Sequence, residues 1–504
     1  MISKKKSSLL IFITALTFTL LQGLLGVIVT RLILTAYGSD FNGVNATANQ
    51  FINVLLLLEG GVTLATNVAL FKPVVNHDTD QINEILAATS KIFHILGVLF
   101  LIIGVIGSFL FVWIIKSDIN KYQIFLLFLF TVIPSAINLF YTTKYAVLLQ
   151  AGQKEYLINN IRIIIIVVTQ ILIILVAIFK LNYLLIRAVH MIFSIISSIL
   201  IVRTCKKRYS ALDLTVPPNF TAIKGTKDVI IQKVTSLLYG TAPILYISIV
   251  LGTIYVSVYA VYNSIFIIIK NLLYSLVNAP RMSFGVLIAE RDNEYVKEKF
   301  LMYEFLIVVT SAIFFSSVMI MIPSFISIYT AGITDANYND QRISLLLSLI
   351  GFIEIIHIPS GHIINMSGNF AYSRKIQSIA TIILIISIPI ASHAWGFIGI
   401  LASILCAAIA LAIMEIGFIH IKYFIHTLLQ ILLILSINML FAVVLCILEI
   451  QYLPSVDSYW EFFMLGVVVF LLNAIVILSI NFIFIRNLSN QIFSLIFKAV
   501  FKEL

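Results

Sequence analysis

The chain has 504 residues, of which 61% are hydrophobic and only 11% are charged. Soluble domains average about 45–50% apolar and about 25% charged residues, so the composition excludes an ordinary soluble enzyme, a nucleic-acid-binding protein and a disordered chain. The net charge of +10 is accounted for in a membrane protein by basic cytoplasmic loops that face anionic lipid headgroups. The sequence therefore predicts an all-α, polytopic membrane protein without a water-soluble module.

Apolar runs of about 20 residues or more, the length that crosses a bilayer, recur along the whole chain. The first run follows Lys4-Lys5-Lys6 and is too long for the hydrophobic region of a cleaved signal peptide, so we expect it to be the first transmembrane helix. The fourteen predicted spans are residues 9–34, 44–71, 92–115, 122–149, 157–179, 181–202, 229–251, 254–279, 301–329, 343–366, 376–393, 396–421, 427–448 and 461–486.

The loops between these spans carry their positive charge on one side. With the N-terminus placed inside, the inside segments hold 23 lysines and arginines and the outside segments hold four, Lys116, Lys121, Lys180 and Arg342. This bias predicts that both termini are cytoplasmic.

The longest connection, residues 203–228, contains Pro217-Pro218 and separates six spans from eight. A weak internal repeat supports a division there: Gly152-x3-Tyr156 and Gly368-x3-Tyr372 lie 216 residues apart, and transporters are commonly built from duplicated bundles. The predicted parts are an N-terminal six-helix lobe (1–202), a cytoplasmic linker (203–228), a C-terminal six-helix lobe (229–421), two additional helices (422–486) and a cytoplasmic amphipathic tail (487–504).

Four predicted spans carry a polar face. At 100° per residue, seven small or polar residues of the second span share an arc of about 80°, and amides in hydrocarbon need partners or water. Such a stripe indicates either a water-filled cavity or a hydrogen-bonded seam between helices. The last two spans lack comparable stripes and are expected to face lipid. The four polar faces comprise Asn42, Asn45, Asn49, Asn53, Gly60, Thr63 and Asn67; Thr131, Pro134, Asn138, Tyr141 and Tyr145; Tyr255, Tyr259, Tyr262, Asn263, Phe266, Lys270 and Tyr274; and Glu354, His357, Gly361, Asn365 and Gly368, with Pro359 interrupting that helix.

Charged residues inside predicted spans are functional candidates because an isolated charge in the bilayer is costly. Those near span ends, Arg162, Arg187 and Lys233, can extend to the interface. Glu59 is a candidate for ion coupling or for a structural pair with an arginine. Glu354 and His357, at i and i+3, are candidates for a proton relay or for a buried structural pair. The eight charged candidates are Arg31, Glu59, Arg162, Arg187, Lys233, Lys270, Glu354 and Glu415.

No enzymatic motif is present. The sequence contains no G-x-S-x-G, no H-E-x-x-H and no Walker-type glycine loop. Its three cysteines, Cys205, Cys406 and Cys446, are too far apart to indicate a disulfide framework or a metal site. We expect no catalytic residue, no metal and no cofactor.

Four short segments resemble a known family. They are Tyr37–Gly43 (YGSDFNG), Leu57–Val62 (LLEGGV), Phe71–Pro73 (FKP) and Leu149–Lys154 (LQAGQK). With the 6+6+2 layout, they resemble the bacterial polysaccharide-transport proteins. These are the flippases for lipid-linked O-antigen and capsule repeat units, which form part of the multidrug/oligosaccharidyl-lipid/polysaccharide exporter superfamily.

The resemblance implies a V-shaped pair of six-helix lobes plus two C-terminal helices. It implies a flippase that moves polyprenyl-diphosphate-linked oligosaccharides from the inner to the outer leaflet of the bacterial cytoplasmic membrane by alternating access, for lipopolysaccharide or capsule biosynthesis. The lipid bilayer and polysaccharide polymerase machinery are expected partners.

The residues fit that substrate independently. A diphosphate needs cations, for which Arg31 and Lys270 are the candidates, and a long prenyl tail suits an apolar groove near the last two spans. Sugars suit amide hydrogen bonds and tyrosine faces. The predicted cavity-lining residues are Asn45, Asn49, Asn53, Asn67, Asn138, Tyr141, Tyr255, Tyr259, Tyr262 and Asn263.

Two other functions compete with the flippase. A multidrug or cation antiporter of the same superfamily would share the first twelve spans, but cation recognition favours buried carboxylates, and the first span offers Arg31 and no acid. A membrane polysaccharide polymerase or ligase would need a sizeable outside loop, and the longest predicted outside loop is Thr330–Arg342.

Overall fold

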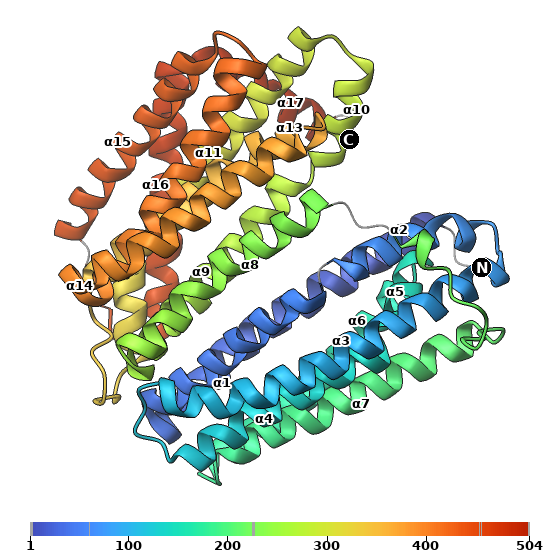
Figure 1. Cartoon of the computed structure of the whole chain (residues 1–504). Helices are drawn as coiled ribbons and strands as arrows, with labels where there is room; N and C mark the ends of the chain where they lie inside the picture. The colour runs from blue at the N-terminus through green and yellow to red at the C-terminus, as the bar shows by residue number, and fades with distance from the viewer. Residues whose placement is uncertain (1–3, 60, 224–226, 453, 455, 502–504) are drawn as a thin grey trace. The chain divides into compact units, whose positions relative to one another are not determined.

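The computed structural model describes residues 4–59, 61–223, 227–452, 454 and 456–501. Within these residues every regular element is a helix (Figure 1), which confirms the predicted fold class. The helices are α1 (Lys4–Leu55), α2 (Val62–Val75), α3 (Thr79–Ile114), α4 (Lys121–Ile137), α5 (Thr143–Ala151), α6 (Glu155–Ile178), α7 (Leu184–Arg208), α8 (Lys227–Val250), α9 (Thr253–Asn278), α10 (Arg281–Glu290), α11 (Asn293–Tyr329), α12 (Gln341–Ile356), α13 (Ile358–Met366), α14 (Phe370–Gly417), α15 (Leu428–Tyr452), α16 (Tyr459–Phe484) and α17 (Arg486–Phe501).

Within the described residues, twelve helical stretches are long and apolar enough to cross a membrane. Two of them, which contain α1 and α14, each include a glycine with non-helical dihedrals, Gly38 (φ 82°) and Gly396 (φ 57°). Side chains other than glycine rarely adopt such positive φ values. Dividing the two stretches at these glycines gives the fourteen predicted spans.

The chain reverses at Gly38. The part of α1 before Gly38 runs parallel to α6: Ser7 donates to the carbonyl of Gln153, just before α6, and Tyr37 donates to that of Leu181, just after it (2.8 Å). The part of α1 after Gly38, together with α2, runs antiparallel to α3. Phe51 of α1 packs on Gly107 near the end of α3, whereas Thr66 of α2, further along the chain, lies 3.3 Å from Thr89 nearer the start of α3.

The chain reverses again at Gly396 in α14. Tyr372 near the start of this helix stacks on Phe418, which follows its end, with ring centroids 4.2 Å apart. The two arms of α14 are therefore an antiparallel pair.

Three other predicted spans are interrupted. The second span is broken by a 3-10 turn at Leu56–Glu59 and by Gly61, whose φ is 85°. The fourth continues from α4 through a π-turn, Asn138–Thr142, into α5, and the tenth breaks at His357, so that Pro359 lies in the first turn of α13. The predicted interruption at Pro359 is confirmed, because proline fits the first turn of a helix and disrupts its interior.

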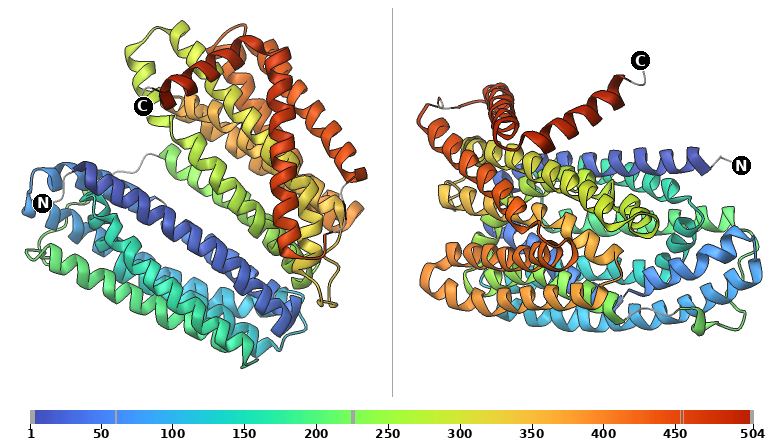
Figure 2. Two further views of the ribbon diagram at one scale, coloured as in Figure 1. Left: turned by 180° about the vertical axis from the view of Figure 1, so that it is seen from behind. Right: turned by 90° about the horizontal axis from the view of Figure 1, so that it is seen from above.

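Packing divides the chain into two compact units. Unit 1 is Met1–Val261 with Ile333–Ala336, and unit 2 is Tyr262–Gly332 with Asn337–Leu504. Helices α1 to α7 of unit 1, coloured blue to green, lie side by side in the left view of Figure 2. The division into lobes at residues 202 and 229 stays a prediction.

The described part of the predicted linker packs against unit 1. Asn83 of α3 donates to the carbonyl of Ala211 and accepts from the amide of Asp213, both at 3.1 Å. Leu212 and Leu214 cover a buried apolar cluster that includes Leu148 and Cys205. Residues 224–226 of the linker, Gly60 of the polar stripe and residues 502–504 of the tail lie outside the described residues.

Helices α15 and α16 expose apolar surfaces, as expected for helices that face lipid, and they also carry buried amides. Their outer surfaces are apolar and exposed, but Asn438 and Asn481 are buried and exchange amide hydrogen bonds of 3.1 and 2.9 Å. Asn473, also buried, donates to Ser317 of α11 at 3.1 Å. Three asparagines spaced along apolar helices were too sparse for a stripe, yet they form the kind of polar seam that joins helices in membranes.

Candidate functional site

The polar stripe of the second span begins in the part of α1 after Gly38. Asn42 is buried and donates to Ser257 of α9 at 2.8 Å, and Asn53 donates to Gln50 at 3.0 Å. Asn67 lies in α2, beyond the break at Leu56–Gly61, so a single continuous face from Asn45 to Asn67 was wrong.

Arg187 of α7 uses this stripe. Its guanidinium donates to the carbonyl of Asn45 at 2.6 Å and to the side-chain oxygen of Asn49 at 3.1 Å. Arg187 is only 6% exposed, so the expectation that it extends to the interface was wrong. Acceptor oxygens of α1 replace water around the guanidinium, which makes an internal position possible.

The predicted cavity-lining residues outside the second span differ in exposure. Asn138, in the π-turn, is exposed, as are Tyr141 and Tyr255, whereas Tyr259 and Asn263 are half-buried. Tyr262 was predicted to line the cavity, but the residue is buried, with 1% of its surface exposed. Its hydroxyl donates to the carbonyl of Tyr338 at 2.7 Å. The sugar-binding role of the other positions stays a prediction.

The two diphosphate candidates lie in different units. Arg31 is half-buried in α1 of unit 1. Lys270 of unit 2 forms an ion pair with Glu354, 3.1 Å between Nζ and Oε2, with both side chains 18% exposed. The structure thus shows Lys270 with a carboxylate partner, and its diphosphate role stays a prediction.

Glu354 and His357 each contact a residue of another helix, Lys270 and Glu415. His357 directly follows α12 and keeps helical dihedrals (φ −85°, ψ −15°), and its Nδ1 lies 2.7 Å from Glu415 of α14. Gly361 makes room for this contact, because a Cβ there would lie 2.7 Å from the Glu415 carboxylate. Each residue therefore has a distant partner in unit 2, and the two alternatives for Glu354 with His357, a proton relay or a structural pair, stay predictions.

A third pair in unit 2 was missed. Glu304 of α11 and His420 at the end of α14 are completely buried, 2.9 Å apart. Ser360 donates to Glu304 at 3.3 Å, and Thr427 lies 2.7 Å from the other ring nitrogen of His420. Both residues lie close to predicted span ends, where a charged side chain normally reaches water. The only sequence signal for a buried pair was the single acid, Glu304, among the apolar residues 300–309.

Glu59 was a candidate for a structural pair with an arginine, and the structure pairs it with a lysine instead. Lys233 of α8 lies 3.4 Å from its carboxylate, within unit 1. Its predicted role in ion coupling stays a prediction.

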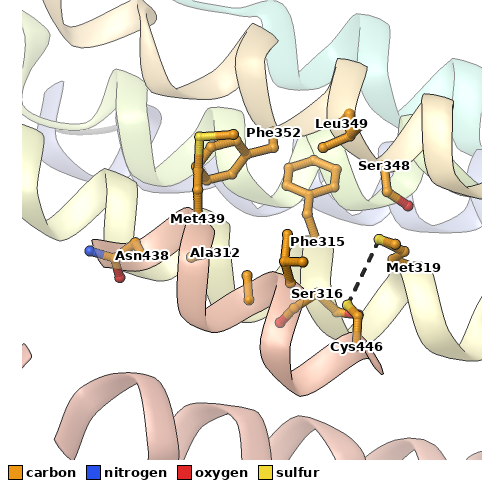
Figure 3. A pocket seen from close by; sticks show the side chains of 12 residues that line it. Ala312, Phe315, Ser316, Met319, Ser348, Leu349, Phe352, Asn438, Met439 and Cys446 are labelled. Atoms are coloured by element: carbon orange, nitrogen blue, oxygen red, sulfur yellow. Dashed lines mark hydrogen bonds between the residues drawn. The ribbon is translucent and has the colours of Figure 1, made fainter. Parts of the chain in front are cut away.

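Unit 2 also contains an apolar pocket between α11, α12 and α15 (Figure 3). The rings of Phe315 and Phe352 and the side chains of Met319 and Met439 line it, and Cys446 closes one end beside Met319. The pocket therefore suits a hydrocarbon ligand.

No family model and no curated protein matches the sequence. Solved structures do match. A structure described as lipid II flippase MurJ in an inward closed conformation has a TM-score of 0.64 and 13% identity, over 94% of this chain and 99% of that one. An inward-facing multidrug resistance MATE-family transporter of the MOP superfamily has a TM-score of 0.59 and 14% identity, over 82% and 94%.

A structure of the MATE multidrug transporter DinF-BH matches at a TM-score of 0.58 and 12% identity, over 82% of this chain and 95% of that one. Identities this low describe the fold alone. The agreement nevertheless extends over nearly the full length of each solved chain. This multi-span membrane chain therefore has the fold seen in the MurJ flippase and MATE transporter structures.

Proposed function

We propose that the protein is a flippase that moves polyprenyl-diphosphate-linked oligosaccharide repeat units from the inner to the outer leaflet of the bacterial cytoplasmic membrane by alternating access. In this proposal both termini are cytoplasmic and the product feeds surface polysaccharide synthesis, with polymerase machinery as a partner. The observation that carries it is the likeness to the lipid II flippase over 94% of the chain, against 82–87% for the MATE transporter structures.

Three kinds of surface support a substrate with sugar, diphosphate and prenyl parts. Exposed or half-buried amides and tyrosines, such as Asn138, Tyr141 and Tyr255, suit sugar hydroxyls. Arg31 and Lys270 are the candidate diphosphate ligands. The apolar pocket beside Phe315 and Phe352 suits part of a prenyl chain.

A multidrug or cation antiporter is the second candidate. Unit 2 holds the buried carboxylates that cation recognition favours, Glu304, Glu354 and Glu415. Each already contacts a lysine or histidine at 2.7–3.1 Å, so each carboxylate has a basic side chain beside it within the unit. This pairing favours the flippase.

The proposal is tested in proteoliposomes that contain a polyprenyl-diphosphate oligosaccharide with a fluorescent sugar. Active flippase exposes the inner-leaflet label to an impermeant quencher, so the quenched fraction rises from about half towards the whole. Empty liposomes and a lipid-linked sugar without the diphosphate are the controls. Equal quenching with and without protein, together with proton-driven uptake of cationic dyes, would establish the antiporter instead.

A further inference from the structure

Positive side chains gather at the end of unit 1 where α5, α6 and α7 meet. Lys144 and Lys206 lie over the same ring, that of Tyr145, at 5.5 and 5.8 Å from its centroid. Lys154 lies 4.0 Å from the ring centroid of Tyr209, next to Arg208. Lys144, Lys154, Lys206 and Arg208 are called the basic corner below.

Two members of the basic corner are held in place. Lys144 donates to the hydroxyl of Ser90 at 2.9 Å and to the carbonyl of Phe140 at 3.3 Å, and it is half-buried. Lys154 is also half-buried, in the short turn between α5 and α6. Burial and then the nearby Arg208 lower the pKa of Lys154.

The positive side chains of the basic corner lie near one another, and none of the four is paired with a carboxylate in the described part of the chain. Lys144 and Lys206 repel each other, as do Lys154 and Arg208. Among the described residues none of the four forms an ion pair, and the adjacent acid, Glu155, accepts from Gln150 at 3.2 Å. The general preference for positive charge at cytoplasmic ends explains exposed lysines. It does not explain lysines half-buried beside like charges and aromatic faces.

We propose that the basic corner binds the phosphate group of a net-negative ligand, at the headgroup level of the leaflet that the loop charges assign to the cytoplasm. A phosphate offers several acceptor oxygens and about one to two negative charges, which would neutralise the repulsion and accept charge-assisted hydrogen bonds. The ligand chemistry is a phosphoester or phosphate anion, supplied either by an anionic membrane lipid or by free phosphate. The site is separate from Arg31 and Lys270 and does not depend on the transported substrate.

The position of the corner gives the bound phosphate a structural consequence. It would join the turn between α5 and α6 to the end of α7, from which residues 209–223 continue across α3. The first turn of α1 reaches the same place, since Ser7 donates to the carbonyl of Gln153. Ligand binding should therefore raise the thermal stability of the whole protein.

The test uses the full-length protein in detergent with phosphatidylglycerol, phosphatidylcholine or inorganic phosphate added separately. Native mass spectrometry counts retained lipid, and thermal unfolding reports stabilisation. We expect phosphatidylglycerol to bind and stabilise the wild type, and Lys154→Ala/Lys206→Ala to bind it at least about tenfold more weakly, since charge-assisted contacts are lost. The matched control, Lys72→Ala/Lys207→Ala, removes two exposed lysines outside the corner and should bind normally.

Each outcome decides the proposal. Lys206→Arg keeps the charge and should keep binding, which separates loss of a ligand from loss of folding. Stabilisation by inorganic phosphate alone, abolished in the corner variant, supports the site with free phosphate as its source. Equal binding of both lipids, or equal loss in the corner and control variants, overturns it. Because binding is measured without transport, failure of the flippase proposal leaves this result unchanged.

Discussion

Lys270 has two candidate roles, and replacing it with alanine separates them when Glu354 is changed as well. The ammonium and the carboxylate lie 3.1 Å apart, and each side chain is 18% exposed. Breaking a buried ion pair costs about 3–5 kcal/mol, and an exposed pair contributes about 0.2–1 kcal/mol. At this partial exposure we expect Lys270→Ala to destabilise the protein by about 2–3 kcal/mol, because it leaves the Glu354 carboxylate without its partner.

The assay is a double-mutant cycle with Lys270→Ala, Glu354→Gln and the double variant. Thermal unfolding in detergent gives the stability, and complementation of a flippase-deficient strain gives surface polysaccharide export at measured protein abundance. We expect a coupling free energy of about 1.5–3 kcal/mol between the two residues. The exposed pair Lys297–Glu294 of α11 is the matched control, and its coupling should stay below about 1 kcal/mol.

The double variant distinguishes the two roles. If Lys270 only neutralises Glu354, the double variant regains both abundance and export. If Lys270 also binds the diphosphate, the double variant regains abundance but not export, and Lys270→Arg retains much of the activity. A coupling energy near zero would refute the reasoning on the pair, and normal export by Lys270→Ala at wild-type abundance would refute the diphosphate role.

Three further predictions concern the membrane orientation, the asparagine seam and the end of a loop. In a variant with Cys406→Ser, Lys207→Cys should react with an impermeant thiol reagent only from the cytoplasmic side and Lys180→Cys only from outside; the reverse pattern would invert the topology. Asn438→Leu should destabilise the protein by about 1–2 kcal/mol, because Asn481 loses its amide partner, and Asn438→Leu/Asn481→Leu should recover most of this loss. Asp340 caps α12, and hydrogen bonds from Arg342 lower the pKa of its carboxyl in the folded protein. The ionised carboxylate therefore stabilises the fold at pH values above the pKa of Asp340 in the unfolded chain. This stabilisation is lost as the pH falls through the lower pKa of Asp340 in the folded protein. The difference in melting temperature between wild type and Asp340→Asn should thus be constant near neutral pH and disappear in acid.

Most of the helical architecture was predictable because hydrophobic length alone identifies membrane spans. The hydrophobic pattern could not show whether residues on either side of a helix break lie on the same face. The arc that joined Asn45 to Asn67 assumed one continuous helix, and the Leu56–Glu59 turn with Gly61 in a positive-φ conformation ends that phase. The adjacent glycines Gly60 and Gly61 were the sequence signal for this break, because glycine readily adopts positive φ values.

Partners of buried charges were less predictable than the charges themselves. Glu354 and His357 were correctly identified as internal, yet each turns to a residue far along the chain, Lys270 and Glu415. Sequence spacing determines only which residues share a helical face. Tertiary packing decides which distant helix supplies the counter-charge, and without it Arg187 appeared to be an interfacial residue.

The distribution of paired charges differs between the units in a way that bears on substrate charge. In unit 2 the described carboxylates Glu304, Glu354 and Glu415 each contact a lysine or histidine at 2.7–3.1 Å. In the described part of unit 1, by contrast, Arg187 and the lysines of the basic corner have amide, carbonyl, hydroxyl or aromatic partners but no carboxylate. A cation held by neutral groups remains able to attract an anion, since neutral dipoles satisfy its hydrogen bonds without cancelling its charge. The phosphate ligand proposed above would therefore supply the basic corner of unit 1 with the negative charge that its neutral partners do not provide.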